Sequence, residues 1–272
     1  MQAFALTIIT TVLLNSFAAL AAETAVEPLL LTRAHAHNDY AHARPLFDAL
    51  DHGFCSVEAD IFLRDGKLLV AHESKQTDPK KTLQALYLDP LRARVQKNHG
   101  HVFAHGQEFT LLIDLKEDWR TLYPALHNVL TDYADILTTF ENDVKHTNAV
   151  LVIISGNRDL NMFARESLRY AAFDGDIDNL GKNQPSTLIP WISIEWKTQF
   201  SWKGRNPLPE AECLKLQSLV ARAHAEHFRL RFWGAPDNPI AWKTLSAASV
   251  DLINTDNLAG VQKFFRETSP PQ

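Results

Sequence analysis

The sequence predicts a (β/α)8 barrel formed by a single domain. Short apolar runs alternate with longer amphipathic stretches along the chain, which is the pattern of parallel strands joined by helices. Several of these runs are rich in Ile, Val and Leu without alternation, as expected for strands covered on both faces. A body of about 250 residues after the first two dozen is a common size for such a barrel.

Eight apolar runs supply the predicted barrel strands, and amphipathic stretches supply the helices. The strands are expected at 30–36, 55–62, 109–115, 150–154, 169–173, 191–195, 228–232 and 250–254. The helices are expected at 45–52, 122–137, 160–169, 210–226 and 240–246, with 258–266 closing the barrel from outside. A further short strand, 68–71, follows the turn Asp65-Gly66 and is expected to form a hairpin with the second strand.

The composition is that of a soluble globular protein, with 46% hydrophobic and 22% charged residues. The formal net charge is -5 without a long run of one sign, which argues against a nucleic-acid-binding surface. No internal repeat or second domain is visible. The polar loop 198–209 is expected either to cover the mouth of the active site or to be an ordinary surface loop.

The first 21 residues are predicted to be a signal peptide, followed by the barrel domain at 22–272. An apolar stretch leads to Ala19-Leu20-Ala21, a small-x-small cleavage pattern, and the first charge is Glu23. The protein is therefore expected to be exported, to the periplasm or outside the cell. The alternative is an uncleaved membrane anchor, because 3–22 is just long enough to span a bilayer.

The chain has two cysteines, Cys55 and Cys213. An exported protein could pair them. Because the sequence does not bring their Cα atoms together, both are predicted to be buried free thiols.

Polar residues concentrate where the first predicted strands end, and in a barrel of this type the functional groups gather at the carboxyl ends of strands. The first strand ends in His35-Ala36-His37-Asn38-Asp39-Tyr40. Alternation would place His35 and His37 on the same side of the strand. Isolated histidines there would usually be satisfied loop residues, but five polar or ionisable residues in six favour a site.

The next two strands and the hairpin add carboxylates, a lysine and a further histidine. Glu58 and Asp60 share one face of the second strand, and Asp114 and Lys116 share one face of the third. Inward carboxylates are costly without ionic partners, and an oxygen-rich site suits one divalent cation, Mg²⁺ or Ca²⁺. His72 ends the hairpin strand near the same rim.

In this order, the motifs resemble the superfamily of phosphatidylinositol-specific phospholipases C and glycerophosphodiester phosphodiesterases. Within it, the chain is most similar to proteins like altered inheritance of mitochondria protein 6, through "HAHNDY", "PLFDAL", "VEADIFL", "RFWGAPDNPIAW" and "VDLINTDNL". The resemblance implies a metal-dependent phosphodiester hydrolase of lipid metabolism. Its substrate would be a small phosphodiester or a phospholipid-derived molecule, with transient membrane-surface contact allowed and no protein partner implied.

The resemblance also assigns roles to residues. His37, followed by Asn38 and Tyr40, matches the first catalytic histidine, and His72 matches the second. His35 is a second candidate for the first histidine, and the His-Arg-Gly motif of the glycerophosphodiesterases is absent. Lys116 would bind the substrate phosphate. The implied metal ligands are Asn38, Glu58, Asp60 and Asp114.

Two other functions compete with this one. Zinc amidohydrolases also begin with His-x-His at the first strand, and Asp256 could match their last aspartate, but no histidine ends the later strands. A non-enzymatic barrel that binds phosphorylated or sugar ligands is the third hypothesis, and retention of every motif residue argues against it. The tryptophans Trp196, Trp202 and Trp233 are expected either to stack on a ligand or to be core or rim residues.

Overall fold

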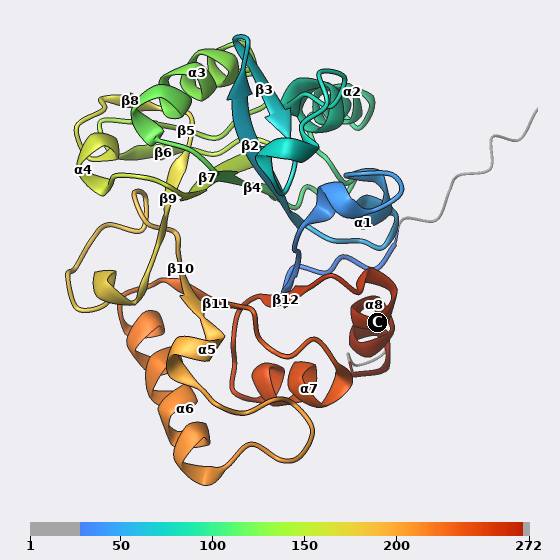
Figure 1. The fold of residues 1–272 in the computed structure, drawn as a ribbon, viewed down its shortest axis with the longest axis vertical. Helices are drawn as coiled ribbons and strands as arrows, with labels where there is room; N and C mark the ends of the chain where they lie inside the picture. The colour runs from blue at the N-terminus through green and yellow to red at the C-terminus, as the bar shows by residue number, and fades with distance from the viewer. Residues whose placement is uncertain (1–27, 269–272) are drawn as a thin grey trace, which may run out of the picture.

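A computed structural model describes residues 28–268 of the chain. Its centre is a nearly closed ring of eight parallel strands in the order β11-β10-β9-β7-β4-β2-β1-β12, surrounded by helices (Figure 1). A parallel bridge between Arg231 and Leu252 brings β11 next to the residues before β12, at the two ends of this order. The predicted (β/α)8 fold class is therefore confirmed.

The barrel strands follow one another around the ring in chain order, as short right-handed crossovers require. They are β1 (Ala34–Ala36), β2 (Ser56–Arg64), β4 (Phe109–Leu115), β7 (Val150–Gly156), β9 (Ala172–Gly175), β10 (Trp191–Glu195), β11 (Arg229–Trp233) and β12 (Ile253–Thr255).

The helices cover the outside of the ring with one apolar face each. In α3, Leu122, Leu126 and Leu130 repeat at the four-residue spacing of a buried stripe, and the side chain of Asp118 caps the helix by accepting from the Arg120 amide. The helices are α1 (Phe47–Asp51), α2 (Asp89–Lys97), α3 (Trp119–Thr131), α4 (Leu160–Phe163), α5 (Trp196–Gln199), α6 (Glu210–Ala225), α7 (Pro239–Ala247) and α8 (Leu258–Thr268).

Inside the ring, an apolar layer lies below a polar one. Leu112 of β4, Ala172 of β9 and Trp191 of β10 belong to one buried apolar cluster. Two residues further along each strand stand Asp114, Asp174 and Ser193, on the same face by the two-residue period. The barrel therefore buries apolar groups in its lower part and presents polar groups toward the carboxyl ends of its strands.

The predicted hairpin is present. β3 (Lys67–Val70) pairs antiparallel with β2, and the two-residue turn has φ 49° at Asp65 and φ 74° at Gly66. Two consecutive positive φ values favour Gly and Asp at these positions. The chain leaves β3 toward the cavity and places His72 at the rim.

Three parts of the fold differ from the sequence prediction. A small antiparallel sheet, β6-β5-β8, is made by β5 (Thr139–Glu141), β6 (Val144–His146) and β8 (Leu168–Arg169), and it was not predicted. Arg169 lies in this sheet, over the ring of Phe140, so the barrel strand starts only at Ala172 and the predicted helix 160–169 shortens to α4. The unpredicted helix α2 follows a π-helical turn and buries only Leu91 and Val95, a weak apolar signal.

The predicted signal peptide lies outside the described residues. Within 28–268, no helix is both long and apolar enough to cross a membrane. The loop 198–209 contributes Thr198 to the cavity described below, while Trp202 is buried with its ring tilted against that of Trp196. It is therefore anchored to the barrel and only its first residues reach the mouth.

Both cysteines are free thiols, as predicted, but only Cys55 is buried. Burial raises the pKa of Cys55 to about 12, so its reactive thiolate is scarce at pH 8. Cys213 is half-buried on α6 and accessible. In native protein at pH 8, a maleimide should therefore modify one thiol rapidly, and denaturant should expose the second. Two thiols reacting at the same rate in the native state would contradict this placement.

Candidate active site

A cavity of about 540 Å³ opens at the carboxyl ends of the barrel strands. It gathers residues from β2, β4, β7, β9, β10 and β11 and from the loops that follow them. Of the residues predicted from sequence, it is lined by His37, Asn38, Glu58, His72, Asp114 and Lys116. Asp60 and His35 lie just beneath this lining, since both side chains are buried.

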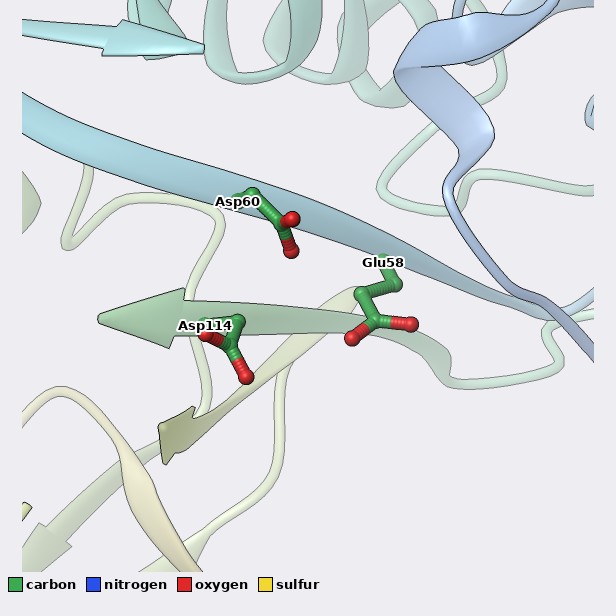
Figure 2. A group of neighbouring side chains, drawn as sticks. All are labelled: Glu58, Asp60 and Asp114. Atoms are coloured by element: carbon green, nitrogen blue, oxygen red, sulfur yellow. The ribbon is translucent and has the colours of Figure 1, made fainter. Parts of the chain in front are cut away.

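Three carboxylates form the centre of the predicted site. Figure 2 shows Glu58 and Asp60 extending from β2 and Asp114 from β4, with their carboxylates pointing into the same space. One carboxylate oxygen of each lies within 4.8 Å of those of the others. Parallel pairing produces this convergence, because Asp60 stands opposite Asp114 in the register of β2 and β4.

The three carboxylates of the cluster face two cations, Lys116 and Arg231. Burial and the charge of Glu58 raise the pKa of Asp60, although Lys116 opposes the shift. The Lys116 ammonium bridges Asp60 and Asp114, with Nζ 2.8 Å from Asp60 Oδ2 and 3.1 Å from Asp114 Oδ1. Asp60 Oδ1 and Glu58 Oε2 are buried without a hydrogen-bond partner. Buried carboxylate oxygens of this kind call for a cation, so the donor set fits an oxygen-preferring divalent metal.

His35 supports the cluster from inside the barrel. It is fully buried, with Nδ1 2.7 Å from Ser56 Oγ and Nε2 3.6 Å from Glu58 Oε2. Burial lowers the pKa of His35 to about 4, with a further contribution from Arg231. The ring is therefore neutral at physiological pH and does not line the cavity.

His37 faces the cavity and is held by a carboxylate from the far end of the chain. Its Nδ1 lies 2.8 Å from Asp256 Oδ1, and its Nε2 lies 3.8 Å from Glu58 Oε2. Burial alone would lower the pKa of His37, but the hydrogen bond to Asp256 and the charge of Glu58 outweigh it, so the pKa is raised above 6.5. The two ring nitrogens therefore have different partners, and Nε2 is directed at the acidic cluster.

His72 lies beside Asp60, the second carboxylate of β2. Its Nδ1 is 3.2 Å from Asp60 Oδ2 and 3.1 Å from the Tyr40 hydroxyl. Tyr40 Oη also lies 2.6 Å from Asp60 Oδ2 and 2.6 Å from Asn38 Oδ1. Asn38 adopts a left-handed conformation, φ 47°, which asparagine tolerates well and which turns its amide into the site.

A second set of polar residues, which the sequence did not predict, lies on β9, β10 and β11. Arg231 of β11 is buried, donates to Ser193 Oγ and Asn254 Oδ1, and comes within 3.8 Å of Glu58 Oε2. Asp174 of β9 accepts from the Ser193 hydroxyl at 2.7 Å. The signal available in the sequence was an inward polar residue at alternating positions of otherwise apolar strands.

Asp256 was considered in the sequence only as a counterpart of the amidohydrolase aspartate. Its role as the partner of His37 depends on β12 lying beside β1, with His35 paired to Asn254 and Ala36 to Thr255.

The three tryptophans that the sequence singled out separate into two groups. Trp233 is 40% exposed and lines the cavity, whereas Trp196 and Trp202 are core residues.

A family model described as the AIM6-like phosphodiesterase domain matches residues 24–174, more than half of the chain. Altered inheritance of mitochondria protein 6 of Eremothecium gossypii is 30% identical, across 86% of this chain and 70% of that protein. The homolog of that protein from Arthroderma benhamiae is 28% identical, across 85% of this chain and 83% of the relative. The family match contains all the site residues predicted from sequence.

Among solved structures, a glycerophosphodiester phosphodiesterase from Parabacteroides distasonis superposes with a TM-score of 0.51. The match covers 88% of this chain and 98% of that one, at 13% sequence identity. At this level of identity, the likeness concerns the barrel fold.

Proposed function

The chain belongs to the AIM6-like phosphodiesterase family, and from this premise we propose that it is a metal-dependent hydrolase of glycerophosphodiesters or of phospholipid headgroups. One observation carries the proposal. The acidic cluster of Glu58, Asp60 and Asp114 has one cavity-lining histidine at Glu58 and another at Asp60, at the carboxyl ends of the barrel strands. This brings cation ligands and acid–base groups together.

Glu58, Asp60 and Asp114 would hold one Mg²⁺ or Ca²⁺, with the Asn38 amide oxygen as a further ligand. When bound, the cation would neutralise charge on a phosphate oxygen in the transition state. Lys116 now occupies two oxygens of the cluster, so its flexible side chain would have to release them. Its ammonium would then be free to pair with a phosphate oxygen of the substrate.

His37 and His72 would divide the proton transfers. Phosphodiester cleavage needs a base to take a proton from the nucleophile and an acid to protonate the leaving oxygen. His37 Nε2 faces the cluster while Asp256 orients its other nitrogen, the arrangement that fixes the tautomer of a catalytic imidazole. His35 would act as a positioning residue, because it contacts Glu58 from beneath and is closed to solvent.

The test is turnover of bis(p-nitrophenyl) phosphate and of a panel of glycerophosphodiesters by purified protein. The protein is stripped with chelator and then resupplied with Mg²⁺, Ca²⁺ or Zn²⁺. Turnover that chelator removes and Mg²⁺ or Ca²⁺ restores supports the proposal. Restoration by Zn²⁺ alone would favour the amidohydrolase-like alternative, and saturable binding of substrates without turnover would favour a non-enzymatic barrel.

Replacing Asp256 with Asn is expected to shift the pH profile as well as the rate. Asp256 raises the pKa of His37, so its removal lowers that pKa. The limb of the profile that belongs to His37 should therefore move to lower pH, whichever of the two proton transfers it performs. kcat should fall about 10-fold or more, because the imidazole loses its orientation. Asp251→Asn, which removes the half-buried carboxylate partner of His224, is the matched control. An unchanged pH profile in Asp256→Asn would contradict this role.

A further inference from the structure

A second cavity lies on the outside of the barrel, between α6, α7 and the loop before α6. Its volume is about 870 Å³, which is within the range of small-molecule sites. It shares no lining residue with the catalytic cavity. Its walls are formed by Pro207, Leu208, Leu216, Pro239 and Ile240 together with the small residues of the end of α7, and we refer to it as the α6–α7 groove.

The walls of the α6–α7 groove are largely apolar and fixed in position. Leu216 is buried at its base, while Ile240 leaves 45% of its surface exposed at its edge. The loop wall is held by buried contacts, since Trp202 Nε1 donates to the Asn206 carbonyl at 2.8 Å. Gly204, at φ 74°, packs so closely that a Cβ there would lie 2.6 Å from Pro236 Cβ. The groove is therefore preformed by the fold.

The charged residues that line the α6–α7 groove are both cationic. Arg205 and Lys243 line it, and none of its lining residues is a carboxylate. Between residues 28 and 268, neither cation takes part in any of the ion pairs. An apolar surface bordered by two unneutralised cations is complementary to a molecule with an apolar chain and a negative head.

We propose that the α6–α7 groove binds a single-chain amphiphile with an anionic head group, of the long-chain carboxylate class. The chain would lie along Leu208, Leu216 and Ile240, and the head would pair with Arg205 and Lys243. A cationic amphiphile of the same chain length would meet the same apolar walls but would be repelled by both side chains. The proposal concerns a site separate from the catalytic cavity, so it does not depend on the phosphodiesterase reaction.

Cys213 gives a direct reading of occupancy, because it lines the α6–α7 groove while the other thiol, Cys55, is buried in the core. Laurate, kept below its micellar concentration, should slow the modification of Cys213 by N-ethylmaleimide in a saturable way. Dodecyltrimethylammonium, with the same chain length, should protect it far less. Calorimetric titration with laurate gives the Kd independently of the labelling.

Three variants test the contacts. Arg205→Ala with Lys243→Ala should raise the laurate Kd about 10-fold, the loss of two rim ion pairs. Ala247→Trp, which fills the end of the groove, should abolish protection. Lys80→Ala with Lys97→Ala removes two exposed lysines elsewhere and should change nothing. Phosphodiester turnover should be the same in all of them, since none of these residues lines the catalytic cavity.

Absence of saturable protection by monomeric laurate would overturn the proposal. Equal protection by both amphiphiles, with no effect of the Arg205 and Lys243 substitutions, would also overturn it. Binding to anionic vesicles without binding of monomeric laurate would assign the groove to a membrane surface and likewise reject this assignment.

Discussion

Replacing Glu58 with Gln and Asp60 with Asn is expected to abolish divalent cation binding. The pair supplies two of the three converging carboxylates, and each substitution removes a charge while keeping nearly the same shape. Titration calorimetry should show one Mg²⁺ or Ca²⁺ site in the native protein and none in the variant. A bound cation contributes several kcal/mol to stabilising the charge of the transition state, so turnover should fall about 10³-fold or more.

The control for this experiment is the double variant Asp132→Asn with Glu210→Gln, which removes two exposed carboxylates that do not line the cavity. It should bind the cation as the native protein does. Thermal unfolding separates loss of the site from loss of the fold, because a ligand that binds only the native state raises its melting temperature. The cation should raise the melting temperature of the native protein and leave that of the Glu58/Asp60 variant unchanged. Unaltered cation affinity in that variant would reject the assignment of the acidic cluster.

Substituting His37 or His72 by Ala is expected to lower turnover by about 10²–10⁴-fold, the usual contribution of one acid–base group. Metal affinity and the fold should be nearly unaffected, because neither ring is part of the apolar core. The native protein should show a bell-shaped dependence of rate on pH with its maximum near neutrality, since both groups must be correctly protonated. Each Ala variant should lose one limb of that profile.

His35→Ala distinguishes the positioning role from the catalytic one. His35 is buried against Ser56 and Glu58, so its loss should weaken metal binding and stability more than it alters the pH profile. His35→Asn keeps a polar group near Ser56 and should recover part of both. If His35→Ala were inactive with a normal cation affinity while His37→Ala kept most of its activity, the two histidines would have been assigned in the wrong order. Full activity in all three histidine variants would reject the two-histidine reaction.

Local sequence patterns predicted the barrel strands, the common faces of the site residues and the hairpin, because each of these depends on neighbouring residues in the chain. Apolar runs without alternation identified the barrel strands, since a parallel strand is covered on both faces. The two-residue period placed Glu58 with Asp60, and Asp114 with Lys116, on common faces. The turn Asp65-Gly66 predicted the hairpin because both positions require positive φ.

Local sequence patterns did not predict the helix α2, the small β6-β5-β8 sheet or the role of Arg231. The signals for these features in the sequence are weak or depend on residues far apart in the chain. The helix α2 buries only two apolar side chains, so its periodicity was faint. The small β6-β5-β8 sheet takes its strands from separate connections, and its pairing depends on contacts such as that of Arg169 with Phe140. Arg231 is one of two arginines in the run 228–233, and only the barrel shows that it approaches Glu58.

The sequence by itself determined the barrel, the family resemblance and the residues of the acidic cluster, because each depends on spacing within a single strand or motif. Tertiary structure decided which of these residues reach the cavity. His35 lies on β1 and His37 directly follows it, yet closure of the ring buries the first against Ser56 and brings Asp256, 219 positions away, to the second. This contact between Asp256 and His37 follows from the pairing of β1 with β12. The free energy that selects the pairing comes from burying the apolar core of the whole barrel. No short stretch of sequence therefore predicts the contact.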